Sequence, residues 1–197
     1  MKSPFAKGCL GLVLLLIVGG GYLFWRAKTP PTVGENFKTL PQEEQQRRRT
    51  DAKKLEDQTA DIVRRVKSGD RKPFRLVATE QQLNTLLQDR IRTDKFALKD
   101  LRVGLKSKQL SLQGTVPYKG LETTATLTGD ISAQNGRVKF NADKLLIGGL
   151  FEAPGDWKDK VEKQVDTQLN KLLENVKVNI TNAVVEDGQL VLEGAAS

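Results

Sequence analysis

Side chains that commonly catalyse reactions are few in this sequence and form no recognisable catalytic pattern. The chain has no histidine, and its single cysteine, Cys9, lies at the edge of an apolar run. These absences exclude histidine general acids and bases, cysteine nucleophiles, intrachain disulfides and nearly all zinc sites. Neither a glycine-rich phosphate loop nor a D-x-D-x-D-G calcium loop occurs. We therefore expect no catalysis, no metal and no cofactor.

Carboxylate side chains are scattered singly over turns and outward strand positions. None forms a pair on an apolar background of the kind that turns a carboxyl group into a general acid. Asp156, Asp159 and Glu162 come closest to a cluster. They fall in the first turns of a predicted helix, where negative side chains stabilise the helix macrodipole without a catalytic role.

The stretch from Leu145 to Phe151, LLIGGLF, is the most informative one for binding. It contains only apolar residues and glycine, and the alternation typical of a half-buried strand stops there. One interpretation is a fully buried strand end that turns through the two glycines into the next helix. The other is a flexible apolar lip beside a hydrophobic groove, or a loop that dips into a bilayer.

Small residues on the inward side of the strand before this stretch allow two interpretations as well. Ala125, Gly129 and Ala133 share one face of that strand, because side chains alternate with a period of two. They either let a helix approach the sheet closely or leave room for a chain-like ligand, and close helix packing is the more favoured interpretation.

The positive charge of the chain is concentrated near its N-terminus. The formal net charge is +8, but residues 1–72 hold 15 Lys and Arg against 8 Asp and Glu, whereas residues 73–197 hold 17 against 16. A nucleic-acid-binding domain would need a basic surface on its folded part, so nucleic acid is not an expected partner. The basic N-terminal third instead suits anionic lipid headgroups.

Residues 9–25, CLGLVLLLIVGGGYLFW, form an uncharged apolar run between Lys7 and Arg26. At about 1.5 Å per residue this run just crosses a hydrocarbon core of about 30 Å. A cleaved signal peptide is the main alternative, but the residues after Trp25 offer no small-x-small cleavage site. We therefore predict a single-pass membrane anchor that follows a cytoplasmic tail, residues 1–8.

The orientation of the predicted anchor in the membrane follows less directly from the sequence, because basic residues flank the apolar run on both sides. A short basic tail with most of the chain downstream is the usual layout of a signal-anchor that exports its domain. We expect a cell-membrane protein with an extracytoplasmic C-terminal domain, and the reverse topology, with a cytoplasmic regulatory role, stays open.

Residues 26–41 contain a pair of prolines and read as a linker. Residues 42–70 are dense in charged and polar side chains, with Leu55 and Ile62 on a thin apolar stripe, which predicts a charged helical stalk. The stalk is expected either to be solvated or to pack on a partner or the membrane.

Residues 73–197 alternate between strand and helix patterns. A strand over 74–78 precedes a helix whose N-cap is Thr79, with Gln82 completing a capping box. Asn135-Gly136 and Asp187-Gly188 are hairpin signals. Further strands are predicted over 101–105, 110–118, 121–134, 138–142, 178–185 and 189–193, with a second helix over 156–176.

Three blocks of this domain resemble a known family. They are Val77–Leu87 (VATEQQLNTLL), Asn135–Leu150 (NGRVKFNADKLLIGGL) and Val184–Gly194 (VVEDGQLVLEG). In order and spacing they are similar to the LmeA-like phospholipid-binding proteins and the YpmS-like membrane proteins of bacterial envelopes. The resemblance covers about residues 74–194 and implies an exported, membrane-tethered domain that binds lipid without catalysis. It identifies no individual ligand contact, because the matches mark turns and helix starts.

The expected fold is α+β: a curved antiparallel meander sheet packed on helices, similar to one half of a TULIP domain. We expect the domain to bind phospholipid or another hydrophobic ligand between the concave sheet face and the second helix. The alternative is a structural or interaction protein of the envelope, with a packed core and a stalk helix that binds a protein partner. The predicted groove and lip consist of Leu127, Ile131, Phe140, Leu145, Ile147, Leu150, Phe151, Trp157 and Val161.

Overall fold

The computed structural model describes residues 33–90, 99–106, 108–118, 120–153, 155–171 and 178–196. The predicted α+β class is confirmed. Within these ranges no helix is long and apolar enough to cross a membrane, and the predicted anchor, 9–25, lies outside them. The elements in chain order are η1 (Phe37–Thr39), α2 (Gln42–Lys67), β1 (Phe74–Thr79), α3 (Glu80–Arg90), β2 (Lys99–Lys106), β3 (Gln109–Tyr118), β4 (Leu121–Gln134), β5 (Arg137–Ile147), β6 (Phe151–Glu152), α4 (Gly155–Lys171), β7 (Val178–Glu186) and β8 (Gln189–Ala196).

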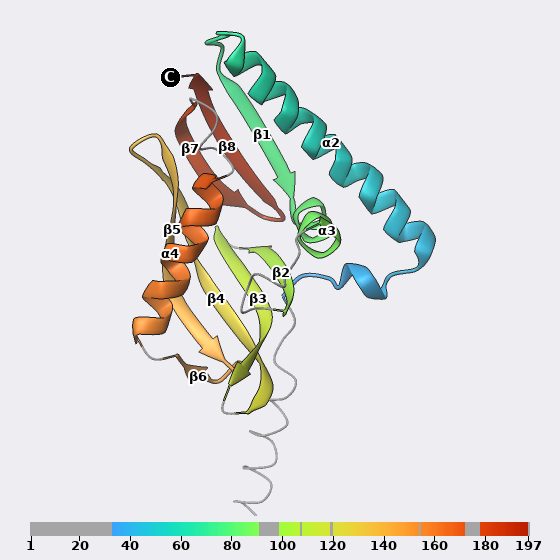
Figure 1. Cartoon of the computed structure of the whole chain (residues 1–197), viewed down its shortest axis with the longest axis vertical. Coiled ribbons are helices and arrows are strands. Elements are labelled where there is room, and N and C mark those ends of the chain that lie inside the picture. Colours follow the sequence, from blue (N-terminus) through green and yellow to red (C-terminus); the bar gives the residue numbers. More distant parts are fainter. Residues whose placement is uncertain are drawn as a thin grey trace, which may run out of the picture.

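The strands form two antiparallel sheets (Figure 1). The larger is a meander with the order β2-β3-β4-β5-β6, and the smaller has the order β1-β8-β7. Two backbone hydrogen bonds join the sheets: Gly188 donates to Leu105 (2.9 Å) and Ile180 donates to Gly136 (3.0 Å). The C-terminal hairpin of β7 and β8 pairs through β8 with β1, which lies far away in the sequence. Strand β7 also packs against β4 of the larger sheet.

The turns and helix starts follow the sequence rules. Thr79 and Gln82 form the predicted capping box, with Thr79 N donating to Gln82 Oε1 (2.9 Å) and Gln82 N donating to Thr79 Oγ1 (3.2 Å). Asn135 and Gly136 both have positive φ, 52° and 76°, as the type I′ turn between β4 and β5 requires.

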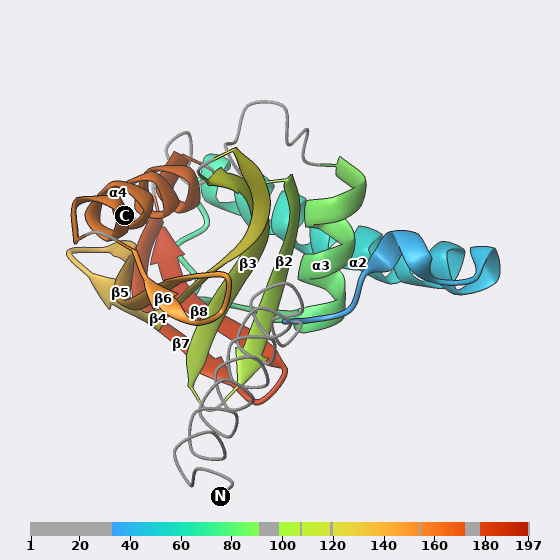
Figure 2. The same cartoon turned by 90° about the horizontal axis from the view of Figure 1, so that it is seen from below.

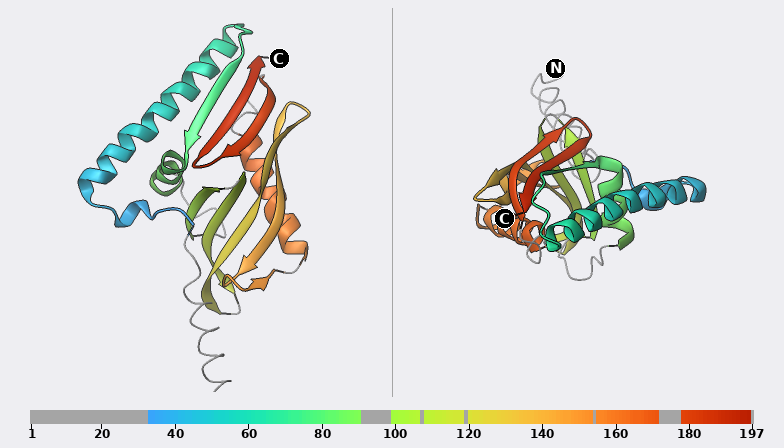
Figure 3. Two further views of the ribbon diagram at one scale, coloured as in Figure 1. Left: turned by 180° about the vertical axis from the view of Figure 1, so that it is seen from behind. Right: turned by 90° about the horizontal axis from the view of Figure 1, so that it is seen from above.

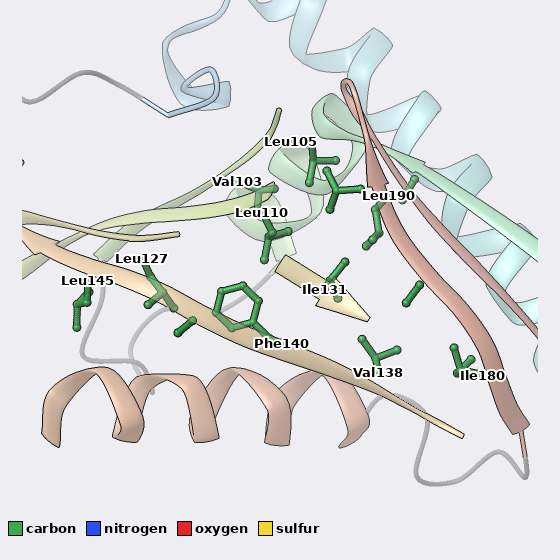
Figure 4. Packing of buried hydrophobic residues seen from close by; sticks show 14 of the residues in the cluster. Val103, Leu105, Leu110, Leu127, Ile131, Val138, Phe140, Leu145, Ile180 and Leu190 are labelled. Carbon is green, nitrogen blue, oxygen red and sulfur yellow. The ribbon is translucent and has the colours of Figure 1, made fainter. Parts of the chain in front are cut away.

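The core lies between the two sheets (Figure 4). Phe140 is at its centre, with 0% of its surface exposed, and Ile131, Val138 and Ile180 are buried beside it. Gly129 makes room for this ring, because a Cβ atom at Gly129 would lie 2.8 Å from Phe140 Cζ. The space left by this small inward residue is therefore filled by an aromatic side chain of the neighbouring strand.

Helix α3 closes one edge of the five-stranded sheet. Strand β2 pairs only with β3, so alternate backbone groups of β2 face outward. Leu105 N donates to Glu80 Oε2 (2.8 Å), and the Asn84 side chain makes two hydrogen bonds to Val103: Val103 N donates to Asn84 Oδ1 (2.8 Å), and Asn84 Nδ2 donates to Val103 O (2.7 Å). The buried Asn84 thus acts as a substitute for a neighbouring strand.

Helix α4 closes the opposite edge in the same way (Figure 2). Phe140 N donates to Asp166 Oδ1 (2.8 Å) and Ala142 N donates to Glu162 Oε2 (3.1 Å), while Lys158 Nζ donates to Ala142 O (3.1 Å). Side chains four residues apart on a helix are separated by about 6 Å, and outward groups two residues apart on a strand by about 6.6 Å. A helix lying along a strand edge can therefore satisfy successive N–H groups.

This arrangement differs from the predicted one, in which both helices cover one face of a single sheet. Both helices lie beside edge strands, and the inner face of the larger sheet is shared with the smaller sheet. The sequence pattern shows which face of a helix is apolar. It does not show that polar residues on the same helix replace a missing strand.

The predicted stalk also differs from expectation. Helix α2 packs against α3 and runs alongside β1 (Figure 3), with Ala52 and Leu55 buried and Ile62 against the core. The chain turns back at Ser68–Asp70, so α2 lies antiparallel to the following strand β1. The apolar stripe of α2 is therefore covered by the chain's own domain.

Residues 33–40, predicted as part of the linker, are bound to the domain as a strap. Val33 fits over Gly104, where a Cβ atom would lie 2.6 Å from Val33 Cγ1. Phe37 is buried, its N–H donates to Gln88 Oε1 (2.9 Å), and Gln88 Nε2 donates to Glu35 O (3.2 Å). Only residues 26–32 separate the predicted anchor from this strap.

The close approach of Gly129 and Phe140 predicts the effect of adding one methyl group. We expect Gly129→Ala in the full-length chain to lower the free energy of unfolding by about 1–3 kcal/mol. Its Cβ atom would lie 2.1 Å from Asn141 O and 2.8 Å from Phe140 Cζ, so the backbone of β5 and the ring must both shift in a packed core. Gly155→Ala is the matched control: a Cβ atom there meets nothing within 4 Å. Guanidinium titration in one detergent measures both, and equal stabilities would contradict the packing described.

A candidate lipid-contact surface

The nine residues of the predicted groove and lip fall into two groups. Leu127 and Phe140 have 2% and 0% of their surface exposed, and Ile131, Leu145 and Ile147 are also buried in the core. A side chain that lined a space wide enough for an acyl chain would present accessible surface to water as well. These five residues therefore belong to the packed interior.

The other four lie at one end of the five-stranded sheet. Phe151 is 68% exposed and Trp157 is 38% exposed, while Leu150 is half-buried and Val161 is half-buried against the core. Leu121, which sequence reasoning missed, is 70% exposed. A leucine that opens a strand directly after Gly120 is a signal that could have identified it.

Ring contacts and strand pairing place these side chains at the same end of the sheet although they come from different elements. The Trp157 and Tyr118 rings meet edge to face, with centroids 6.1 Å apart, and Tyr118 pairs with Leu121 across the β3–β4 turn. Phe151 pairs with Ile147 in the β5–β6 hairpin. We call Leu121, Leu150, Phe151 and Trp157 the apolar end.

The LLIGGLF stretch combines the two interpretations made from its sequence. Leu145 and Ile147 are buried, as the strand interpretation requires. Gly148 and Gly149 then both have positive φ, 63° and 70°, and Gly148 N donates to Thr124 O (2.7 Å). The tight turn reverses the chain, and Phe151 points out of the protein on a two-residue strand.

Charges around the apolar end are balanced by ion pairs. Lys99 Nζ lies 2.8 Å from Glu122 Oε1, and the hydrogen bond to that carboxylate raises the pKa of Lys99. Lys144 Nζ lies 3.5 Å from Glu152 Oε1, and the Lys160–Asp156 pair is 3.0 Å apart. Each pair joins one positive and one negative group, so together they carry no net charge.

The described part of the chain shows no group of three or more His, Cys, Asp or Glu residues that could hold a metal ion. Between α2 and α3 lies a small polar cleft of about 40 Å³, room for about two water molecules. The Arg49–Asp89 ion pair, at 3.0 Å, closes one side of it. This cleft is too small for an organic ligand.

Comparisons with known proteins give no further guide to the site. No family model, no curated protein and no solved structure matches this chain. The resemblance noted from the three sequence blocks thus stays a prediction.

Truncation of a buried residue and truncation of an exposed residue should lower the free energy of unfolding by very different amounts. We expect Leu127→Ala to lower the free energy of unfolding by about 2–5 kcal/mol, because it leaves a cavity in the core. Phe151→Ser and Leu121→Ser remove side chains that are already mostly in water, so their cost should stay within about 0.5 kcal/mol. Denaturant titration of the full-length variants measures this, and a large loss at Phe151 would show that the apolar end is structural.

The edge contacts that hold α4 in place lead to a second prediction. We expect Asp166→Leu to lower the free energy of unfolding by about 1–3 kcal/mol, because the Phe140 N–H group loses its partly buried acceptor and Lys139 loses one of its ion-pair partners. Asp166→Asn keeps an acceptor oxygen of similar size and is the matched control. Hydrogen exchange at the Phe140 amide should accelerate in the leucine variant only. Equal exchange in both variants would show that this hydrogen bond does not protect the edge.

Proposed function

We propose that this protein is a membrane-anchored, non-enzymatic domain of the bacterial cell envelope that binds phospholipid through its apolar end. The observation that carries this proposal is the gathering of exposed Leu121, Phe151 and Trp157 at one end of the described structure. Exposed apolar side chains that gather in one place mark interaction surfaces more often than scattered ones do. The half-TULIP-like fold and the extracytoplasmic location belong to the same proposal.

The rigid surroundings of these side chains support the proposal. Phe151 pairs across the β5–β6 hairpin with the buried Ile147, and Trp157 is held edge to face against Tyr118. Side chains ordered in this way lose little conformational freedom on binding, so more of the apolar burial contributes to affinity. The buried core beneath limits the lipid contact to this end and argues against a chain enclosed inside the domain.

A second candidate is a structural or interaction protein of the envelope. The complete burial of Phe140 and Leu127 favours it, because a packed core leaves no interior site for a ligand. In this function a protein partner binds the charged outer face of α2, since the apolar stripe with Leu55 is already buried against the domain.

Photolabelling distinguishes these two functions. The full-length chain, in detergent micelles without a bilayer, is incubated with phosphatidylethanolamine that carries a diazirine in one acyl chain, and adducts are located by peptide mass spectrometry. We expect saturable labelling within residues 120–161 that unlabelled lipid competes away. Labelling confined to residues 9–25 would contradict lipid binding and favour the structural function.

The double variant Leu121→Ser/Phe151→Ser provides the specificity test. A large apolar side chain contributes about 1.5–3 kcal/mol when fully buried, so losing two should weaken labelling at the apolar end by about tenfold or more. Labelling of residues 9–25 serves as the internal reference and should stay unchanged. Lys67→Ser, on the far side of the molecule at the end of α2, is the control that should label normally.

A further inference from the structure

We infer that the apolar end inserts into the surface of the same bilayer that holds the predicted anchor. The occupant of this surface is a phospholipid bilayer, not a second copy of the chain. The inference rests on the proposed membrane anchoring, and it adds the orientation of the domain relative to its own membrane.

The first step is the place where the chain reaches the domain. Val33 N donates to Gln113 Oε1 (3.1 Å), and Gln113 Nε2 donates to Thr126 Oγ1 (3.2 Å). The strap therefore begins on the outer face of the five-stranded sheet, level with Thr126 on β4. Because Val33 fits over Gly104 and Phe37 is buried, this point is fixed on the domain.

The second step is the reach of the seven residues from 26 to 32. Fully extended, the eight steps from Trp25 to Val33 span at most about 29 Å. Along β4, Leu121 is five residues from Thr126, about 16 Å, whereas Asn135 at the other end of the strand is nine residues away, about 30 Å. A bilayer at the end of this short connection therefore lies well within reach of the apolar end, whereas the β4–β5 turn lies at the limit of the fully extended connection.

The third step is the chemistry of the surfaces within reach. The outer face of β4 presents the hydroxyl groups of Thr124, Thr126 and Thr128, which would lose water against a hydrocarbon surface at a cost. At the apolar end, the side chains of Leu121, Leu150 and Phe151 carry no polar group, so their burial in hydrocarbon is favourable. Its flanking ion pairs, such as Lys99–Glu122, carry no net charge, so insertion should depend little on anionic lipid or on salt.

Trp157 makes this inference measurable in the full-length chain. Trp25→Phe leaves Trp157 as its only tryptophan. The variant is reconstituted into phosphatidylcholine vesicles, with or without lipids brominated in the upper acyl chain. An apolar side chain about 5–10 Å deep would be quenched at least about twofold. Raising the salt from 0.1 M to about 0.5 M should leave quenching nearly unchanged. Unquenched Trp157 would overturn the inference.

Two further variants are controls for the quenching experiment. Arg71→Trp, in a chain with both native tryptophans replaced by phenylalanine, places the probe in the α2–β1 connection at the opposite end of the molecule (Figure 1), and it should stay unquenched. Equal quenching there would also overturn the inference, since it would mean nonspecific contact. Phe151→Asp should abolish the quenching of Trp157, while denaturant titration confirms that this variant is folded.

Photolabelling in micelles and Trp157 quenching in vesicles together distinguish a failure of this inference from a failure of the proposed function. Labelling of the apolar end in micelles together with unquenched Trp157 in vesicles would retain lipid binding and reject docking on the chain's own bilayer. Quenching of Trp157 without saturable labelling would support docking and reject the binding of individual lipid molecules. A loss of quenching that coincides with dimer formation on size-exclusion chromatography would assign the surface to a second copy and overturn the inference.

Discussion

Unpaired backbone groups at the two edges of the five-stranded sheet set the constraint on which the rest of the structure depends. A buried N–H group without an acceptor costs about 1–3 kcal/mol, and an open edge invites pairing with another chain. Here Glu80 and Asn84 on α3 serve β2, and Glu162 and Asp166 on α4 serve β5. Both helices are thereby fixed along strand edges, which leaves the inner sheet face for the smaller sheet to cover.

The same constraint positions the apolar end. Helix α4 is held by its contacts to Phe140 and Ala142, and the Asp166 carboxylate also raises the pKa of Lys139 through a hydrogen bond. With the helix fixed at this edge, its first turn carries Trp157 to the Tyr118 ring. Trp157 thus occupies a defined position because Glu162 and Asp166, five and nine residues further along α4, are hydrogen-bonded to the strand edge.

Local features of the fold were predictable from the sequence because they depend on neighbouring residues. The Thr79–Gln82 capping box and the Asn135-Gly136 turn are examples, since three or fewer intervening residues decide them. The pairing of β1 with β8 was not predictable, because it joins segments more than 100 residues apart. Of the predicted groove and lip, Phe151 and Trp157 are exposed. Phe140 was misplaced, since alternation cannot tell a groove lining from a filled core.

In the proposed function, the strap, the packed core and the apolar end together place the lipid contact at the surface of the domain. Gly104 allows the strap to lie against the sheet, and Gly129 allows Phe140 to fill the interior. Short tethering would then keep the apolar end near the membrane at a high effective concentration, so that weak individual contacts suffice. The predicted anchor, the packed core and the exposed apolar end would thereby form one arrangement at the membrane.

The depth of Leu121 tests the central claim most directly. A nitroxide attached at Leu121→Cys, in a full-length chain with Cys9→Ser, can be compared for its collisions with oxygen, which concentrates in hydrocarbon, and with a nickel chelate, which stays in water. In phosphatidylcholine vesicles the account predicts that oxygen collisions dominate at this position. A label as accessible to the nickel chelate as one placed on the exposed face of α2 would contradict it.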